Sequence, residues 1–290
     1  MPLVGQRWMK NRNLIYKVWD RLGPILFPLR CPVCDKILTP EEVERGIHSI
    51  CREKLLFVQG PVCMHCGKSL KNMEHTAQTK TAYFIEAHAE EFCTECQRKG
   101  YVRTSFYAKS ANYPQNNKVH RPCISQGKAI YFYRGEMKKT MYRFKYGNRR
   151  SYARYFAQEA IRVYGDWIRQ QRIDVIVPVP MFWKKQRRRG YNQAESFGKE
   201  LSRLLEIPLE TKLVQRVKDT IPQKELGETE RKNNLENAFQ IKKNIVQYKY
   251  ILLVDDIYTT GSTVEAVARE LFQKGVREIF VLSICIGEDI

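Results

Sequence analysis

The sequence predicts an α/β protein in which a parallel β-sheet is flanked by helices and preceded by a small cysteine-rich module. Over residues 128–290, strand-like runs alternate with helical patterns, and the strands are continuously apolar, as in sheets that are buried on both faces. Seven of the nine cysteines lie within 31–96, several at CxxC spacing. That spacing, in a chain with cytosolic character, favours metal binding over disulfides.

Composition shifts along the chain predict four segments. Residues 1–24 carry Leu14, Val18 and Leu22 at helical spacing and predict an amphipathic helix that packs on its own module. The alternative is a helix that binds a membrane surface or a partner. Residues 25–110 form the cysteine-rich module, and 111–127 form a linker, because this stretch is rich in Asn, Gln and Pro and has no apolar period. Residues 128–290 form the α/β domain.

Strands and helices in the α/β domain follow from local patterns. The run 175–180 is β-branched and bounded by prolines, and 250–256 is apolar until it ends in two acids. Helices are expected where apolar residues recur every three or four positions, as at Val264, Val267 and Leu271. The expected strands are 128–133, 175–180, 250–256 and 279–286, and the expected helices are 136–146, 151–171, 193–206 and 263–274.

The cysteines form three CxxC pairs and leave Cys51 alone. Two such pairs can supply the four thiolates of a tetrahedral metal site. The simplest grouping is Cys63, Cys66, Cys93 and Cys96. The remaining set is Cys31, Cys34 and Cys51 with one further ligand, for which His48 is a candidate. The alternatives are that His48 is a plain surface histidine and that this site is degenerate or takes its ligand elsewhere. A thioredoxin-like redox role would need a βαβ context around the motif, which is absent here.

The charge balance indicates an anionic partner. Lys and Arg number 50 against 31 Asp and Glu, a formal charge of +19. Nucleic acid, a membrane surface and a phosphorylated ligand all fit this excess. No apolar run approaches the roughly 20 residues of a membrane span, and the N-terminus lacks a secretory pattern. We therefore expect a cytoplasmic protein without a transmembrane segment.

The most informative segment is ILLVDDIYTTGST, 251–263, which joins an apolar strand to a helix N-terminus. Gly261 permits a tight loop, and a helix N-terminus with hydroxyl side chains suits phosphate. Asp255 and Asp256 follow the strand, where open α/β sheets bind ligands. Carboxylates repel phosphate, so sugar hydroxyls or a water-bridged Mg²⁺ are their expected targets. The alternative is that the acids and threonines only cap the helix. The hydroxyl residues are Thr259, Thr260, Ser262 and Thr263.

This segment resembles the phosphoribosyl-pyrophosphate (PRPP) loop of type I phosphoribosyltransferases. The resemblance implies that Asp255 and Asp256 bind the ribose diol and act as the catalytic residues, that 259–263 hold the 5′-phosphate, and that Mg²⁺ binds with the pyrophosphate. It also implies a pyrophosphate loop after the strand at 175–180, with Lys184, Lys185 and Arg187 available as cations. Thr259 stands where the 6-oxopurine salvage enzymes have a base-contacting Asp, which argues against purine salvage.

The chain as a whole is similar to the ComF family. Four motifs occur in order behind the cysteine-rich module and before the PRPP loop: RFKYGN (143–148), VPVP (177–180), RRRGYNQA (187–194) and PQKELGETERKNNLENAF (222–239). The resemblance implies a zinc ribbon with structural Zn²⁺ in 25–110 and a phosphoribosyltransferase-like domain in 128–290. It implies a mobile loop over 222–236 with Lys224, Arg231 and Asn234. Family members often have a CxxC at Cys51, which would place a ligand at Lys54, and a protonated lysine cannot serve there.

The resemblance also carries functional expectations. Some family members are needed for natural transformation, in which single-stranded DNA enters the cytoplasm, so a role there or in nucleotide metabolism is implied. The sequence leaves open whether PRPP is turned over, because no base-recognition motif is evident. The alternative is a non-catalytic, zinc-dependent module for single-stranded DNA with PRPP as a regulatory or vestigial ligand. Candidate partners are PRPP, single-stranded DNA, the DNA-uptake machinery and a second copy of the chain.

The densest cationic run, KKQRRRG at 184–190, is flanked by Phe182, Trp183 and Tyr191, and 142–155 interleaves Arg and Lys with Tyr and Phe. Cations beside stacking rings are what single-stranded nucleic acid requires. The alternatives are that these cations serve the pyrophosphate of PRPP or form a solvated face.

Overall fold

The computed structural model describes residues 28–70, 92–98, 123–219, 235, 237–242, 245 and 247–287. The predicted N-terminal helix, most of the predicted linker and nearly all of the predicted mobile loop at 222–236, Lys224 included, lie outside these ranges. Two compact units divide the chain, Met1–Lys54 and Leu55–Ile290. The boundary falls inside the predicted cysteine-rich module. None of the helices in the described ranges is both long enough and apolar enough to cross a lipid bilayer.

The first unit contains two short helices, α2 (Pro40–Val43) and α3 (Ser49–Glu53). Glu42 accepts hydrogen bonds from the backbone N–H and the hydroxyl of Thr39, at 3.0 and 2.9 Å, and so fixes the start of α2. His48 is the N-cap residue of α3, and Cys51 is buried in that helix. Such short helices are marginal by themselves. Helix α2 has no buried residue and α3 buries only Cys51, whereas Val33, Leu38 and Ile47, outside both helices, are buried.

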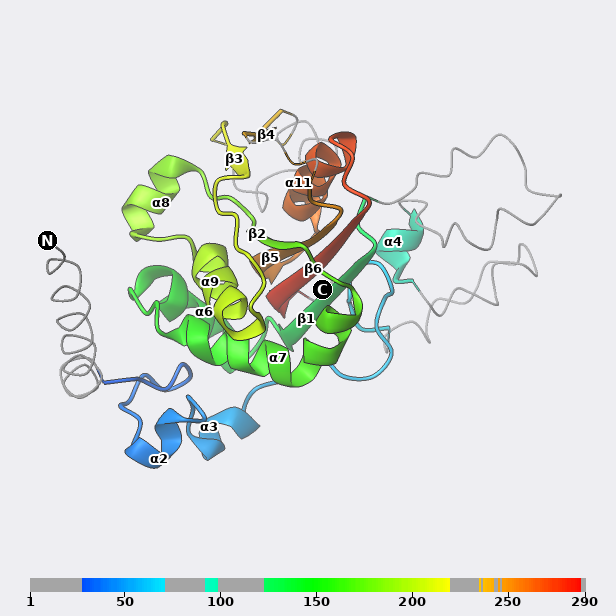
Figure 1. The fold of residues 1–290 in the computed structure, drawn as a ribbon. Coiled ribbons are helices and arrows are strands. Elements are labelled where there is room, and N and C mark those ends of the chain that lie inside the picture. The colour runs from blue at the N-terminus through cyan, green and yellow to red at the C-terminus, as the bar shows by residue number, and fades with distance from the viewer. Residues whose placement is uncertain are drawn as a thin grey trace, which may run out of the picture. The chain divides into compact units, whose positions relative to one another are not determined.

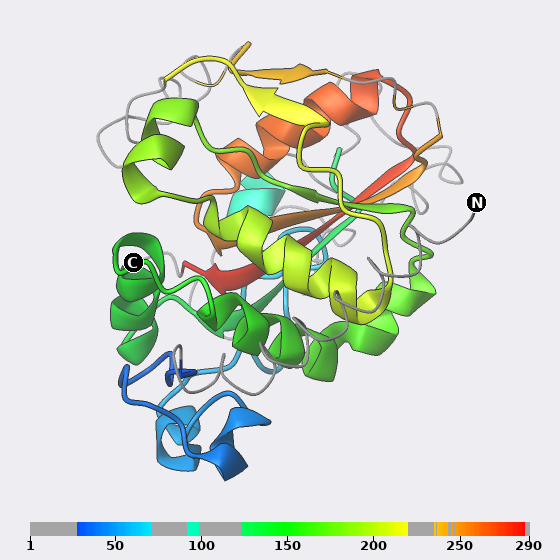
Figure 2. The same cartoon turned by 60° about the vertical axis from the view of Figure 1, so that its left-hand side comes forward.

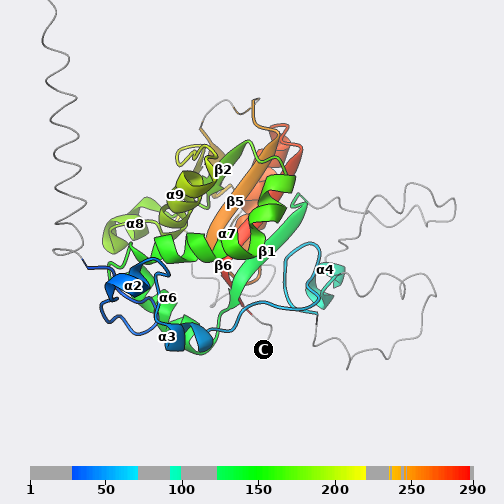
Figure 3. The same ribbon diagram turned by 60° about the horizontal axis from the view of Figure 1, so that its bottom comes forward.

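The second unit is built on a parallel sheet with the strand order β1-β6-β5-β2 (Figure 3). Its strands are β1 (Gln126–Phe132), β2 (Val175–Pro178), β5 (Tyr250–Tyr258) and β6 (Glu278–Ile286). The apolar run of β5 is fully buried from Ile251 to Val254, as a central strand that is covered on both faces requires. The predicted α/β class with a parallel sheet is confirmed.

Helices cover both faces of this sheet (Figures 1 and 2). One face carries α7 (Tyr152–Gln170) and α9 (Gln193–Leu205), with α6 (Glu136–Tyr146) beside them, and the other carries α11 (Ser262–Gln273). Asn192 caps α9, because its side-chain oxygen accepts the N–H of Ala194 at 3.1 Å. All eight predicted strands and helices of this domain are therefore present, with ends that differ by a few residues.

Within residues 128–290, three further described elements were not predicted from the sequence. The cationic run after β2 forms a helix, α8 (Trp183–Arg189), rather than a loop, because Lys, Gln and Arg are good helix formers and Gly190 ends the helix at φ 81°. A two-stranded antiparallel sheet pairs β3 (Val214–Arg216) with β4 (Phe239–Ile241). Each of these strands has only three residues, too few to show a clear alternating pattern.

The second half of the cysteine-rich segment packs with the sheet. The N–H of Val58 donates to the carbonyl of Ile130, and the N–H of Phe132 donates to the carbonyl of Leu56, both at 2.9 Å. Residues 56–58 thereby pair with the edge strand β1. Helix α4 (Thr94–Arg98) lies beside β1 in Figures 1 and 3. The second CxxC pair and the third therefore belong to the core of the sheet unit.

Candidate functional site

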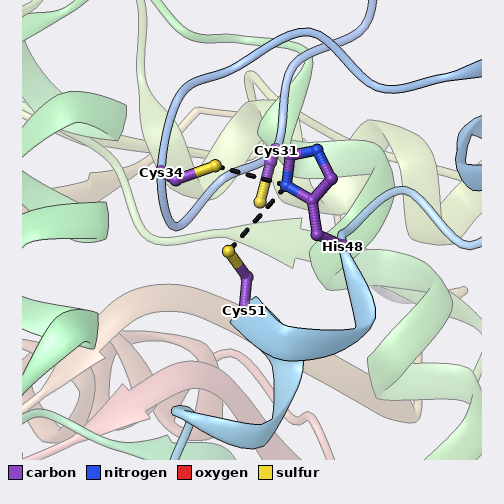
Figure 4. Close-up of side chains that lie close together, drawn as sticks. All are labelled: Cys31, Cys34, His48 and Cys51. Carbon is purple, nitrogen blue, oxygen red and sulfur yellow. Dashed lines mark hydrogen bonds between the residues drawn. The ribbon is translucent and has the colours of Figure 1, made fainter.

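Four side chains in the first unit meet around one point (Figure 4). Their ligand atoms lie within 4.8 Å of one another, and the residues are Cys31, Cys34, His48 and Cys51. The Nδ1 atom of His48 is 3.2 Å from the Sγ of Cys34 and 3.8 Å from the Sγ of Cys51. A zinc tetrahedron with bonds of about 2.3 Å has sulfur–sulfur edges of about 3.8 Å, so the donor set and the spacing fit structural zinc.

The surroundings of His48 suit a metal ligand rather than a plain surface histidine. Its Nε2 atom faces the Oε2 of Glu42 at 3.6 Å, while Nδ1 faces the thiols. A carboxylate behind a metal-binding imidazole fixes the ring orientation and the tautomer. Lys54, the position at which the family resemblance would place a fourth ligand, is instead the C-cap residue of α3. The structure thus places His48 where the missing ligand was expected.

A second group of four side chains lies in the sheet unit. Cys63, Cys66, Cys93 and Cys96 are all buried, and their sulfur atoms lie within 4.8 Å of one another. Cys63 and Cys66 come from a tight turn, and Cys96 comes from α4. Near them, Lys68 forms an ion pair with Glu95 at 2.6 Å that joins the turn to α4. Four buried thiols this close together fit a structural zinc ion.

We expect two zinc ions per chain, one in each group. Cys34→Ser should remove the first and Cys96→Ser the second, so that each variant retains about one zinc and the double variant retains none. Elemental analysis of freshly purified protein measures this, with Cys123→Ser as the control for loss of a thiol outside both groups. A wild-type zinc content near zero would contradict both assignments. A content near one would contradict one of them, and the variant that then loses its zinc would identify the group that binds it.

The acidic pair lies near the carboxyl end of the central strand β5, which continues past the acids and stays paired with β6 up to Tyr258. Asp255 and Asp256 are only partly accessible, and an Oδ1 of Asp255 accepts the N–H of Asp256 at 2.8 Å. Burial, reinforced by the neighbouring Asp256, raises the pKa of Asp255 to about 8. Burial that opposes ionisation of a carboxyl group costs the folded state free energy near neutral pH. Carboxyl groups with such raised pKa values are typical of functional positions.

Two cations that the sequence analysis did not assign to the site face the acidic pair. Lys145, on α6, contacts the Oδ2 of Asp256 through its Nζ at 2.9 Å. Burial alone would lower the pKa of Lys145, but Asp256 and Asp255 outweigh it, so the net shift is upward. Arg216, on β3, is close enough to lower the pKa of Asp255. Lys145 lies in the RFKYGN motif, 111 residues before Asp256, so no local spacing could have linked them.

The loop after β5 leads directly into α11. Gly261, at φ 76°, is the N-cap residue, and the carbonyl of Gly261 accepts the N–H of Glu265 at 2.8 Å. The hydroxyls of Thr260 and Ser262 lie 2.9 Å apart, while Thr259 is exposed. The first turn of a helix offers N–H donors that its own ladder does not use. The structure therefore places hydroxyls, N–H donors and two carboxylates around the carboxyl end of one strand.

The predicted pyrophosphate cations lie on α8. This helix follows β2, which pairs in parallel with β5, so both strands end at the same edge of the sheet. Lys184 lies over the ring of Trp183 at 5.6 Å, Lys185 contacts Asp219 at 3.3 Å, and Arg187 is exposed. Their assignment to pyrophosphate stays a prediction, as does that of Lys224.

Comparison with known proteins agrees with this arrangement. The double zinc ribbon domain family matches residues 22–97, and the phosphoribosyl transferase domain family matches residues 191–286. Competence protein F of Haemophilus influenzae is 31% identical over 242 residues, covering 82% of this chain and 94% of that protein. The chain belongs to the ComF family.

Other ComF-family relatives match over different lengths. Competence protein ComFC of Bacillus subtilis is 28% identical over 233 residues, 74% of this chain and 90% of that protein. The DNA utilization protein YhgH of Escherichia coli K12 is 38% identical over 112 residues, 39% of this chain and 49% of that protein. The family assignment therefore covers both the cysteine-rich segment and the sheet domain of this ComF-family protein.

Proposed function

We propose that this ComF-family protein binds PRPP with Mg²⁺ at the carboxyl end of β5 and acts in the handling of DNA during natural transformation or in nucleotide metabolism. The observation that carries the proposal is the acidic pair joined to the Gly261 loop at the start of α11, within the segment that matches the phosphoribosyl transferase domain. The names of these relatives, competence and DNA utilization proteins, support the cellular role.

Each part of the site has a separate task in this proposal. The carboxylates of Asp255 and Asp256 accept hydrogen bonds from the ribose hydroxyls, and Lys145 holds Asp256 in place through its 2.9 Å contact. The loop 259–263 and the first turn of α11 bind the 5′-phosphate. Lys184, Arg187 and Lys224 are the cations proposed for the pyrophosphate, which Mg²⁺ would partly neutralise when bound.

If a nitrogenous base also binds, the same site supports phosphoribosyl transfer. The bond between the ribose carbon and pyrophosphate breaks, and the base nitrogen forms a bond to that carbon. The residues then act chiefly by orienting PRPP and stabilising the charge that develops on the ribose. Release of pyrophosphate that depends on an added base would establish transfer, whereas PRPP binding without release in a screen of bases would favour a regulatory role for PRPP.

Titration calorimetry of the zinc-loaded full chain with PRPP and Mg²⁺ tests the proposal directly. We expect one binding site per chain with a Kd in the micromolar range, about −8 kcal/mol. Ribose 5-phosphate, which lacks the pyrophosphate, is the matched ligand and should bind more weakly. Heat no different from that of dilution, at protein concentrations of tens of micromolar, would refute the assignment of the site.

PRPP affinity should rise with pH up to about 8. In the free protein, the raised pKa of about 8 keeps Asp255 largely protonated at pH 7, whereas binding the ribose favours the carboxylate. Binding therefore releases a proton, and Kd falls by up to about tenfold per pH unit between pH 7 and 8 before it levels off. Calorimetry in buffers of different ionisation enthalpy measures the released proton. Asp255→Asn should remove the pH dependence, and an equal dependence in that variant would assign it to another group.

A surface formed by α6 and α8 favours a second function, binding of single-stranded DNA. Tyr142, Tyr146 and Trp183 are 66%, 53% and 57% exposed, which is unusual for such large rings. The guanidinium of Arg189 lies 5.0 Å from the ring centre of Tyr146 and donates a hydrogen bond to its hydroxyl at 3.1 Å. Phe182 and Tyr191, the other rings that flank the cationic run, are buried. Exposed rings beside cations provide both stacking and phosphate contacts.

We expect this surface to bind single strands with strong salt dependence. Replacing Lys184, Arg187 and Arg188 by Ala should weaken binding of an oligothymidine and reduce the slope of log K against log salt by about 2. Trp183→Ala should weaken binding by about 1–3 kcal/mol with little change in slope. The matched control replaces three other exposed cations by Ala: Arg269 on α11, and Lys274 and Arg277 after the end of that helix. Equal losses in both sets would indicate unspecific attraction by the net charge.

A further inference from the structure

Tyr258 lies directly beneath the loop that is proposed to bind PRPP. It is the last residue of β5 and is 4% exposed. A Cβ atom placed on Gly261 would be 2.1 Å from the Oη of Tyr258 and 2.5 Å from its Cζ. The backbone of the loop at Gly261 therefore rests on the phenol ring with no space between them, and the position of that ring sets the position of the loop.

The other surroundings of Tyr258 include the second thiol group. The phenol belongs to one continuous cluster of buried side chains that also contains Cys63, Cys66, Cys93 and Cys96, together with Val264 on the first turn of α11. Burial raises the pKa of Tyr258 well above its ordinary value, and Cys66 and Cys96 are close enough to raise it further. The ring thus belongs to the same tightly packed interior as the four thiols and the loop.

The turn that carries Cys63 and Cys66 is also fixed to the sheet. A Cβ atom on Gly67 would be 2.7 Å from the carbonyl oxygen of Gly127, and one on Gly127 would be 2.9 Å from the carbonyl oxygen of His65. The turn and the start of β1 therefore touch backbone to backbone. A metal ion held by all four thiols joins this turn to α4, so loss of the ion would loosen the packing around the phenol.

We propose that Tyr258 is a positioning residue through which the second thiol group, when it holds zinc, keeps the Gly261 loop in its binding shape. This inference rests on the proposed function, because it concerns the loop assigned to PRPP. If zinc in the second group strengthens PRPP binding, PRPP must strengthen zinc retention in that group by the same factor. The zinc ribbon then acts on the sheet domain as well as on its own fold.

Hydrogen exchange in the full chain tests, without any PRPP, whether the second thiol group holds the Gly261 loop in place. Amides of 259–264 should exchange about tenfold faster in Cys96→Ser than in the zinc-loaded wild type, whereas those of α9 should be unchanged. Cys123→Ser is the matched control and should leave the loop unaffected. Equal loop exchange in Cys96→Ser and the wild type would overturn the inference. Faster exchange in α9 as well would show that Cys96→Ser unfolds the domain generally. In that case the second measurement, on protein whose second thiol group is intact, decides whether the inference holds.

The second measurement uses Cys34→Ser protein, in which only the second group retains zinc. Saturating PRPP with Mg²⁺ should raise the zinc affinity of this group about tenfold, measured by equilibrium competition with a chromogenic chelator. Tyr258→Leu in the same background should abolish that gain, and Tyr258→Phe, which keeps the ring, should restore it. Equal zinc affinity with and without PRPP, from protein shown to bind PRPP, would overturn the inference. Absence of PRPP binding by zinc-loaded wild type would instead refute the proposed function, and the exchange result would then test only whether the second thiol group holds the Gly261 loop in place.

Discussion

Replacing both acids at the end of β5, Asp255→Asn with Asp256→Asn, is expected to abolish PRPP binding. Each carboxylate that accepts a ribose hydroxyl contributes about 1.5–3 kcal/mol, because the acceptor is charged. Loss of both should weaken binding by a factor of roughly 100 to 10,000, beyond the range of calorimetry for a micromolar ligand. Titration of the purified variant with PRPP and Mg²⁺ measures this loss, and PRPP affinity within about threefold of the wild type would contradict the site assignment.

The fold should survive this change, and the single variants show why. In the native protein Asp255 holds its proton up to about pH 8, whereas an unfolded Asp loses it near pH 4. The stability contributed by this raised pKa is therefore present at low pH and is lost as the pH rises towards 8. Asp255→Asn should accordingly melt no lower than the wild type at pH 8. Asp256→Asn should melt lower, because Lys145 loses its 2.9 Å partner.

An exposed carboxylate supplies the control for nonspecific effects of charge. Asp166→Asn removes one negative charge from the surface of α7, where the Asp166 side chain is 92% exposed and pairs with Arg169 one turn away. We expect its PRPP affinity and its melting temperature to match those of the wild type. A comparable loss of PRPP binding in Asp166→Asn would show that the net charge of the chain, rather than the acidic pair, controls the affinity.

Gly261→Ala is expected to have the second largest effect. The added Cβ atom would lie 2.1 Å from the hydroxyl oxygen of Tyr258, so the loop or the phenol must move. The left-handed backbone at φ 76° adds about 1–2 kcal/mol for any residue with a side chain. Because the loop would shift away from the acids, PRPP affinity should fall by more than about tenfold, which calorimetry on the folded variant measures.

Gly275→Ala is the matched control for this substitution. Gly275 has φ 90°, and a Cβ atom there would have nothing within 4 Å, so the variant carries the backbone strain without the collision. Gly275→Ala should lower the melting temperature by an amount similar to the backbone part of Gly261→Ala and leave PRPP affinity unchanged. If both variants bind PRPP as the wild type does, the close packing of Gly261 on Tyr258 has no part in binding.

The strands and helices of the sheet domain could be predicted because their signals are local. A buried parallel strand such as β5 must be apolar on both faces, and a helix such as α9 must bury one stripe, so each pattern is complete within a few residues. The helix α8 was missed because its cationic residues also suit a phosphate-binding loop. The strands β3 and β4 were missed because three residues carry too little pattern.

The two cysteine-containing groups also show which contacts local sequence patterns can predict and which they cannot. CxxC spacing alone pairs Cys63 with Cys66 and Cys93 with Cys96, because two residues in a tight turn bring both sulfurs to one point. The same spacing left the fourth partner of Cys31, Cys34 and Cys51 open. The fold of α3 makes His48 the candidate, since this N-cap residue is carried to within 3.2 Å of Cys34.

The sequence by itself determined the parallel α/β class, the three cysteine pairs and the acidic pair before a Gly-containing loop. Each of these features depends on a pattern of residues that are close together in the chain. Only the tertiary structure brought Lys145 and Arg216 to the acids and Tyr258 beneath Gly261 within the same buried cluster as the second thiol group. Most of these residues are tens to about two hundred positions apart in the chain. Tyr258 and Gly261 are close in sequence, but the direction in which the Tyr258 ring points depends on the strand that carries it. Side-chain position across such separations is set by packing of whole strands and helices, which local sequence patterns do not contain.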